Sequence, residues 1–321
     1  MASLFLGTSL KKLADRLPLL QRLLWALEAL PVAMLAGISR LLPADWASAT
    51  GRSVLRRIGP RLDKSRKFRR NLSLAFPGKS LQEIEMLVRE SWGNLGAVLA
   101  EFPHLGRLAR PDFSGRVEIV RHGHSPVFRQ NGPPAVFVTA HLANWEVTAP
   151  VIKQLGISVS GMYTPLQNPW LDRMLHRMRA RIGINLLSRQ EGIRALVAEL
   201  NQGHSVGLLV DQRVDSGEPV AFFGIDMNTS TTPARLALRY DCDLIPVQVE
   251  RLRGFRFRVT FHEPVTAAEG ISDNHGKVLD MTGKINGLFE EWITAAPQDW
   301  LCSKRRWPKD AQPRHAPLRN T

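Results

Sequence analysis

From Phe113 onward, short apolar runs alternate with longer segments in which apolar residues recur at helical spacing. The short runs predict buried strands, and the segments between them predict helices. We expect strands at residues 117–120, 135–139, 158–163, 206–210, 244–250 and 257–261, and helices at residues 145–155, 169–182, 190–201, 233–239 and 278–295. This alternation is typical of an α/β fold, here with a largely parallel central sheet flanked by helices.

The first part of the chain has a helical pattern instead. Residues 17–43 are mostly apolar, and between Arg22 and Arg40 the only charged residue is Glu28. A helix that spans a bilayer needs roughly 20 apolar residues, and a carboxylate near its centre is costly. No small-residue cleavage site follows the apolar stretch, which argues against a secretory signal peptide. We expect this helix to associate with a membrane, either in the interface or spanning it, with a buried core helix as the alternative.

A second helix begins with a capping signature. Glu83 follows Ser80 at the spacing of a capping box, and apolar residues then recur at helical spacing as far as Phe102. We therefore divide the chain into an N-terminal membrane-associating helical region, the main α/β domain and a flexible tail, at residues 1–50, 51–308 and 309–321.

The composition is strongly basic. The 321 residues include 43 Lys and Arg against 29 Asp and Glu, a formal net charge of +14. Such a surface favours an anionic partner, and basic residues directly after a membrane-seeking helix, as at residues 52–70, favour anionic lipid. The two cysteines, Cys242 and Cys302, lack the spacing of a zinc site or a disulfide framework. A reducing compartment is the simplest interpretation.

The strand predicted at residues 135–139 leads into HLANWE, from His141 to Glu146. The strand is apolar on both faces, which places it in the centre of the sheet, and ligands bind beyond the carboxyl ends of such strands. If His141 precedes the helix, its ring can fold back so that Glu146 accepts the proton of one ring nitrogen. The other nitrogen can then take a proton from a substrate hydroxyl. The alternative is an ordinary polar cap between strand and helix.

Polar residues also follow two other predicted strands. Asp211, Gln212 and Arg213 follow the strand at residues 206–210, and the segment at residues 164–168 follows another. Because strand ends of one sheet converge, we expect these groups to line one cleft with His141. Near the C-terminus, two arginines and two tryptophans fit either a membrane-interface belt or a packed helix end, namely Trp300, Arg305, Arg306 and Trp307.

Several segments, taken in order, carry a family resemblance. They are RRNLSLAFPG, TAHLANWE, GMYTPLQNPWLDRMLHRMRARIG, LLVDQRV, AFFGIDMNTSTTPARLAL, LIPVQVERL and DWLCSKRRWP. Together they resemble the lauroyl/myristoyl acyltransferases of lipid A biosynthesis in Gram-negative bacteria. These belong to the glycerolipid-type acyltransferases marked by His, four residues, then Asp or Glu. The resemblance extends from about Leu17 to Pro308.

The resemblance implies a membrane-bound enzyme on the cytoplasmic face of the bacterial inner membrane. Such an enzyme moves a fatty acyl group from acyl carrier protein, or acyl-CoA, to a hydroxyl of an anionic lipid A precursor. It implies no cofactor and no metal. Carried over by position, His141 is the general base and Glu146 orients it, while the expected substrate-binding residues are Asn168, Arg179, Arg181 and Asp211. The chain has no GxSxG motif and no cysteine near HLANWE in sequence, so we expect direct transfer without an acyl-enzyme.

Other functions remain open from the sequence. The same family chemistry can act on another membrane glycolipid or aminolipid, and water in place of the acceptor would make the protein an acyl thioesterase. A nucleic-acid-binding protein is disfavoured, because the basic residues are not interleaved with aromatic stacking positions and no nucleic-acid motif is present.

Overall fold

The computed structural model describes residues 18–108, 115–188 and 192–312. Its central feature is a seven-stranded sheet in the order β1-β9-β8-β2-β5-β3-β4. Strands β8, β2, β5, β3 and β4 are parallel to one another, whereas β9 is antiparallel to β8 and carries β1 parallel to itself. The strands are β1 (Val117–Arg121), β2 (Val136–Thr139), β3 (Val159–Tyr163), β4 (Asn185–Ser188), β5 (Ser205–Leu209), β8 (Leu244–Arg251) and β9 (Phe257–Phe261).

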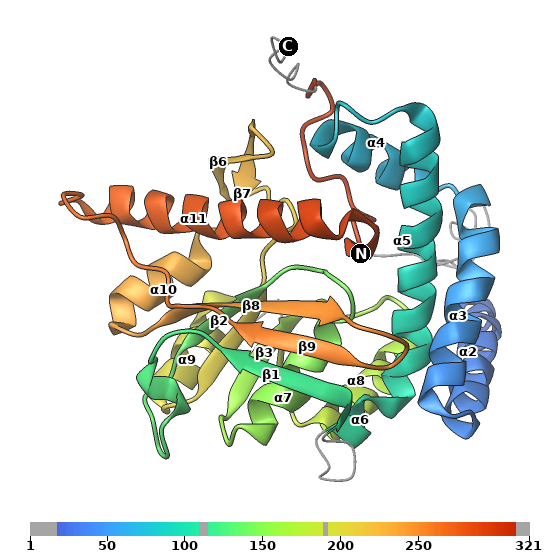
Figure 1. The fold of residues 1–321 in the computed structure, drawn as a ribbon. Helices are drawn as coiled ribbons and strands as arrows, with labels where there is room; N and C mark the ends of the chain where they lie inside the picture. Colours follow the sequence, from blue (N-terminus) through green and yellow to red (C-terminus); the bar gives the residue numbers. More distant parts are fainter. Residues whose placement is uncertain (1–17, 109–114, 189–191, 313–321) are drawn as a thin grey trace.

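Helices cover this sheet and extend beyond one end of it (Figure 1). They are α2 (Pro18–Leu41), α3 (Ala44–Ile58), α4 (Ser65–Ala75), α5 (Leu81–Glu101), α6 (Leu105–Leu108), α7 (Thr148–Gln154), α8 (Pro169–Ile182), α9 (Ile193–Asn201), α10 (Thr232–Tyr240) and α11 (Asn274–Ala295). The predicted α/β fold with a largely parallel, helix-flanked sheet is confirmed. Residues 190 and 191 of the helix expected at 190–201 lie outside the described residues.

The core lies on both faces of β2. Val136 and Val138 pack into the cluster that includes α11, and Phe137, between them, packs into a second cluster with α7. Alternate side chains of a strand point to opposite faces, so helices on both faces bury every residue of β2. This explains why its sequence is continuously apolar.

The sequence pattern missed three strands. β4 is a short edge strand with Asn185 and Ser188 at its ends, and β6 (Glu218–Phe222) and β7 (Ile225–Thr229) form an antiparallel hairpin outside the main sheet. The hairpin turns through Phe223 and Gly224, which both have positive φ. These strands carry Asn, Ser, Glu, Pro and Asp, residues that are depleted in buried strands, and therefore lack the apolar signal.

Helices α2 and α3 lie beside α5, away from the sheet (Figure 1). A Cβ atom at Gly51 of α3 or at Gly96 of α5 would overlap the backbone carbonyl oxygen of the other glycine, so the two helices cross at close range. The expected capping box at the start of α5 is confirmed: Ser80 Oγ accepts from the Glu83 N–H and Glu83 accepts from the Ser80 N–H. The boundary predicted after residue 50 falls inside α3, and most of the tail at 309–321 lies outside the described residues.

Within α2, the segment Leu19–Leu41 is long and apolar enough to cross a membrane, and only 6% of its most apolar window is buried. Its outward side exposes Leu23, Leu27, Leu30, Met34 and Ile38, each more than half accessible. Such exposure contradicts the alternative of a buried core helix. Large exposed apolar surfaces of soluble proteins commonly mark interaction with a partner or a membrane.

Candidate active site

His141 lies just beyond the carboxyl end of β2, before any helical residue. The C-terminal segment fixes this loop: the Leu301 N–H donates to the His141 carbonyl at 2.8 Å, and Leu142 forms a β-bridge with Trp300. Ala143 adopts a positive φ of 47°, and its N–H donates to the Asp299 carbonyl at 3.0 Å. The expectation that His141 precedes the helix in a non-helical conformation is therefore confirmed.

The ring of His141 pairs with Asp211. Nδ1 of His141 lies 2.6 Å from Oδ1 of Asp211, which follows β5. The sheet register explains the pairing: Thr139 of β2 is opposite Leu209 of β5, and two residues further along these neighbouring parallel strands stand His141 and Asp211. Strand ends that converge in this way position both groups without a dedicated loop.

Asp211 is almost fully buried and accepts a second hydrogen bond, from Nε1 of Trp300 at 3.0 Å. Burial alone raises the pKa of this carboxyl. The His141 ring, the Trp300 N–H and the Arg306 guanidinium outweigh that effect, and the pKa lies below its ordinary value. An ionised Asp211 accepts the proton on Nδ1 of His141, which leaves Nε2 with its lone pair.

The free side of the ring is accessible. The His141 side chain is 17% exposed, and Trp145 packs against it with ring centroids 5.0 Å apart. Nε2 of Gln212 lies 3.2 Å from Nε2 and 3.4 Å from Nδ1 of His141, so its amide lies against the ring and is not in line with the lone pair of either nitrogen. The expectation that the polar strand end at 211–213 lies close to His141 is thus confirmed for Asp211 and Gln212, whereas Trp300 was not expected at the site.

Glu146 does not orient His141, which corrects the expected pairing. It lies in the 3₁₀ turn Trp145–Val147 and binds the guanidinium of Arg179, with Nε donating to Oε2 at 3.2 Å and Nη2 donating to Oε1. Arg179 comes from α8 and also stacks on Phe102 at 5.9 Å from the ring centroid. Since His141 Nδ1 is already bonded to Asp211, Glu146 positions an arginine beside the histidine loop instead.

The remaining predicted residues do not converge on His141. Asn168 caps α8 by accepting from the backbone N–H groups of Trp170 and Leu171, and its amide donates to the Trp25 carbonyl and to Glu28 of α2. This use of its polar atoms indicates a structural role. Arg181 is exposed on α8 and lines a separate groove there.

A buried network of hydrogen bonds and one ion pair anchors the loop that follows His141 to α5 and β8. Arg251 of β8 and Glu101 of α5 form an ion pair with side chains 8% and 0% exposed. The other oxygen of Glu101 accepts from the amide of Asn144 at 2.7 Å, and the amide of Asn94 donates to the Ala143 carbonyl at 2.9 Å. Through these bonds α5 and β8 fix the two residues before the 3₁₀ turn.

The C-terminal residues are packed rather than arranged as a membrane-interface belt. Trp300, Arg306 and Trp307 are buried, and the guanidinium of Arg306 stacks on Phe222 at 4.4 Å from the ring centroid. Cys302, distant from HLANWE in sequence, lines the same small cavity as Asp211. Burial raises the pKa of its thiol, which disfavours the nucleophilic thiolate.

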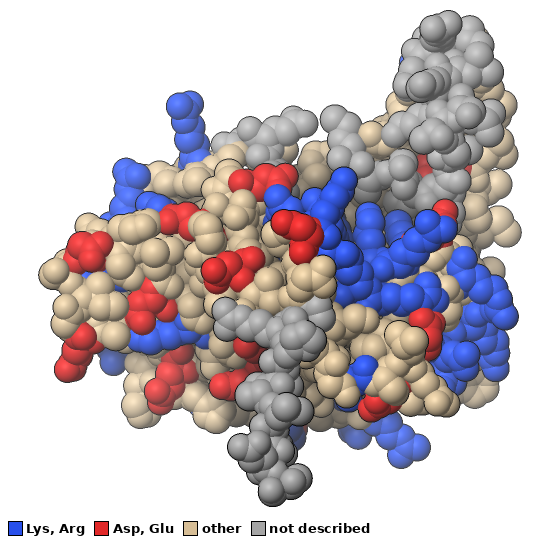
Figure 2. All heavy atoms as spheres, turned by 90° about the horizontal axis from the view of Figure 1, so that it is seen from above, with Lys and Arg blue, Asp and Glu red and all other residues tan. Residues whose placement is uncertain are grey.

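Basic side chains gather on one half of the face seen in Figure 2, on the side of α4, while acidic ones are scattered over the rest. Within the described residues, no group of three or more His, Cys, Asp or Glu side chains could hold a metal ion. The basic residues of α4 and of the cavity beside Asp211 are Arg66, Lys67, Arg69, Arg70, Arg213, Lys304, Arg305 and the buried Arg306.

A family model described as bacterial lipid A biosynthesis acyltransferase matches residues 16–309. The chain belongs to this family. The matched residues include α2, the sheet and the loops at its strand ends, so both His141 and the apolar helix lie within the family match.

Curated relatives of the family are similar at modest identity. The lipid A biosynthesis myristoyltransferase of Escherichia coli is 28% identical over 185 residues, which cover 57% of each chain. Lipid A biosynthesis acyltransferase 2 of Shigella flexneri is 28% identical over 56% of this chain and 58% of its own. The lipid A biosynthesis acyltransferase of Haemophilus influenzae is 21% identical over 79% and 80%. The matches thus span a little over half the length of the first two relatives.

Among solved structures, the chain is similar to the 1-acyl-sn-glycerophosphate acyltransferase of Thermotoga maritima. The identity is 12% and the TM-score 0.37, over 73% of this chain and 95% of that one. A similarity this distant assigns no residue role. The pairing of His141 with Asp211 rests only on the geometry of this protein.

Proposed function

We propose that this protein transfers a fatty acyl group from acyl carrier protein, or acyl-CoA, to a hydroxyl of a lipid A precursor. Family membership supports the reaction class. The observation that carries the proposal is the His141–Asp211 pair at the end of β2, with Nδ1 held at 2.6 Å by a buried carboxylate. This arrangement prepares Nε2 of a partly accessible ring as a general base.

In the proposed step, the acceptor hydroxyl binds at Nε2 of His141 and gives its proton to that nitrogen. The acceptor oxygen then forms a bond to the thioester carbonyl carbon, and the carbon–sulfur bond breaks. The leaving thiolate takes the proton back from the imidazolium, so the protein ends unchanged. Asp211 stabilises the imidazolium while it exists, because the carboxylate directly contacts the charged ring.

Arg179 is the proposed group that polarises the thioester carbonyl. Its side chain is 20% exposed, and its guanidinium is held in orientation by Glu146, which follows His141 by five residues. A guanidinium fixed by one carboxylate still has N–H groups for a developing oxyanion. In this proposal Glu146 acts through Arg179.

The partners follow from charge and surface. Acyl carrier protein and lipid A precursors are acidic, and the basic face in Figure 2 complements both. The exposed apolar side of α2 supports association with the inner membrane from its cytoplasmic face, where anionic lipid attracts basic segments such as α4.

The test is an acyl-transfer assay on the full chain in detergent, with acyl carrier proteins of several chain lengths and a lipid A precursor. We expect transfer by the native protein and a loss of at least about a hundredfold in His141→Ala, with an unchanged circular dichroism spectrum. A variant that keeps most of its activity contradicts the role of His141. Free fatty acid released without lipid would instead identify a thioesterase.

A further inference from the structure

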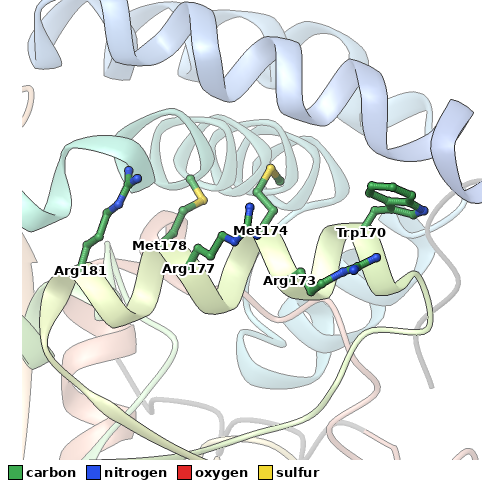
Figure 3. A pocket seen from close by; sticks show the side chains of 6 residues that line it. All are labelled: Trp170, Arg173, Met174, Arg177, Met178 and Arg181. Carbon is green, nitrogen blue, oxygen red and sulfur yellow. The ribbon is translucent and has the colours of Figure 1, made fainter.

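An open groove runs along the side of α8 that faces α2, and its volume is about 260 Å³. Figure 3 shows its side chains rising from α8, with α2 above them. They recur at positions i, i+3, i+4, i+7, i+8 and i+11, which form one continuous stripe on a helix. The lining residues are Trp170, Arg173, Met174, Arg177, Met178 and Arg181.

The groove is separate from the candidate active site. Arg179, which binds Glu146, is two residues from both Arg177 and Arg181. At 3.6 residues per turn, two residues correspond to a rotation of about 200°, so Arg179 projects from the opposite side of α8. One helix therefore presents one arginine to the histidine loop and three to the groove.

The groove arginines have positive charge that the protein does not neutralise. Among the described residues, Arg173, Arg177 and Arg181 take part in none of the ion pairs. Arg173 donates only to the Pro169 carbonyl at 3.1 Å and stacks on Trp170 at 4.8 Å. Successive arginines are four residues apart, about 6 Å along the axis, so they form a row of about 12 Å. Guanidinium groups bind phosphate oxygens in bidentate fashion.

The rest of the lining is apolar. Trp170 is 52% exposed, and Met174 and Met178 are partly buried beside it. A free phosphate would leave the apolar side chains without contacts, and a purely apolar ligand would leave the arginines without a counter-charge. The combination fits an anionic molecule with methylene chains, because thioether and indole groups adapt to an irregular apolar surface.

The position of the groove beside α2 indicates that this molecule comes from the membrane. The start of α8 is bonded to α2 through the Asn168 amide, which donates to the Trp25 carbonyl and to Glu28. The outward side of α2 carries the exposed leucines that we place in the membrane interface. We propose that the groove on α8 binds a phospholipid of the leaflet, with its phosphate on Arg173, Arg177 and Arg181 and its first methylenes on Trp170, Met174 and Met178. The proposed function enters only through the membrane location of α2.

The experiment uses quenching of tryptophan emission by lipids with dibrominated chains, on the full chain in neutral detergent micelles. The chain has eight tryptophans, so the signal of Trp170 is taken as the difference between the native protein and Trp170→Phe. The probes are dibrominated phosphatidic acid and dibrominated diacylglycerol, which share chains and differ in the phosphate. We expect phosphatidic acid to quench Trp170 at a mole fraction at least about tenfold lower, a difference of about 1.4 kcal/mol.

Two triple variants with the same change in charge separate the groove from general attraction. R173Q/R177Q/R181Q should lose the preference for phosphatidic acid, whereas R129Q/R194Q/R253Q, which changes arginines outside the groove, should keep it. An equal loss in both variants overturns the site, as does equal quenching by the two lipids in the native protein. Displacement of phosphatidic acid by millimolar inorganic phosphate assigns the arginines to a soluble anion and also overturns it.

The acyl-transfer assay separates this proposal from the proposed function. Selective quenching of Trp170 in a protein that shows no acyl transfer supports the lipid groove and contradicts the proposed function. Acyl transfer in a protein without selective quenching supports the proposed function and contradicts the lipid groove. The comparison of the two lipids needs only Trp170→Phe and neither triple variant, so the proposal stays testable even if a triple variant fails to fold.

Discussion

Replacing Asp211 by Asn tests the pairing on which the proposed chemistry depends. The indole N–H of Trp300 can only donate, so the amide oxygen of the substituted side chain has to remain facing it. The amide NH₂ then points at Nδ1 of His141, where the carboxylate oxygen now lies 2.6 Å away. This arrangement moves the ring proton to Nε2, and the nitrogen that should accept the substrate proton no longer can.

The magnitude follows from the same contact. Two unit charges at 2.6 Å attract by about 6 kcal/mol at an effective dielectric constant of about 20. Partial hydration of a ring that is 17% exposed reduces the part lost in the transition state. We therefore expect kcat to fall by about 10³ to 10⁴-fold, or about 4–5.5 kcal/mol. The comparable Asp→Asn change in serine proteases lowers kcat by about 10⁴-fold.

The assay is the initial rate of acyl transfer at saturating acyl donor, with KM expected to change little. Glu146→Gln is the matched control: its amide oxygen still accepts from Arg179, and we expect a loss of about tenfold or less. In D211N/W300F the introduced amide can turn its oxygen toward His141, so this double variant should be more active than D211N alone. Activity of D211N within tenfold of the native enzyme would refute the reasoning, as would an equal loss in Glu146→Gln.

Two predictions concern stability. Glu101→Ala leaves the Arg251 guanidinium buried without its carboxylate and should lower the free energy of unfolding, measured by heating, by about 3–5 kcal/mol. Glu118→Ala breaks an exposed ion pair and should lower it by about 1 kcal/mol or less. Similar losses in the two variants would contradict the buried network. Hydrogen bonds to Glu199, above all the one from the Ser160 hydroxyl, lower the pKa of its carboxyl in the folded protein. The ionised carboxylate therefore stabilises the fold above the pKa of the unfolded state, and this contribution is lost as the pH falls through the pKa of the folded state. Unfolding measured from pH 7 to pH 4 should therefore show Glu199→Gln about 1–3 kcal/mol less stable near neutrality, with the gap narrowing at low pH; a gap independent of pH would contradict this.

Local pattern determined much of the fold. Continuous apolar residues at 135–139 identify a central strand because both faces of β2 are covered, and the spacing of Ser80 and Glu83 marks the start of α5. The position of His141 just beyond the end of β2 follows from the same pattern. These features depend on residues close together in the chain, where geometry is limited by the periods of strand and helix.

The partner of His141 was decided by tertiary structure. Asp211 is 70 residues away, and only the pairing of β5 beside β2 in that register brings it to the ring, while α8 supplies Arg179 to Glu146. The sequence placed a histidine and a carboxylate five residues apart but did not specify where either side chain points. It likewise determined that α2 is apolar and α8 rich in arginine. That the two helices pack together was decided by tertiary structure, because contacts between helices join residues that no local period relates.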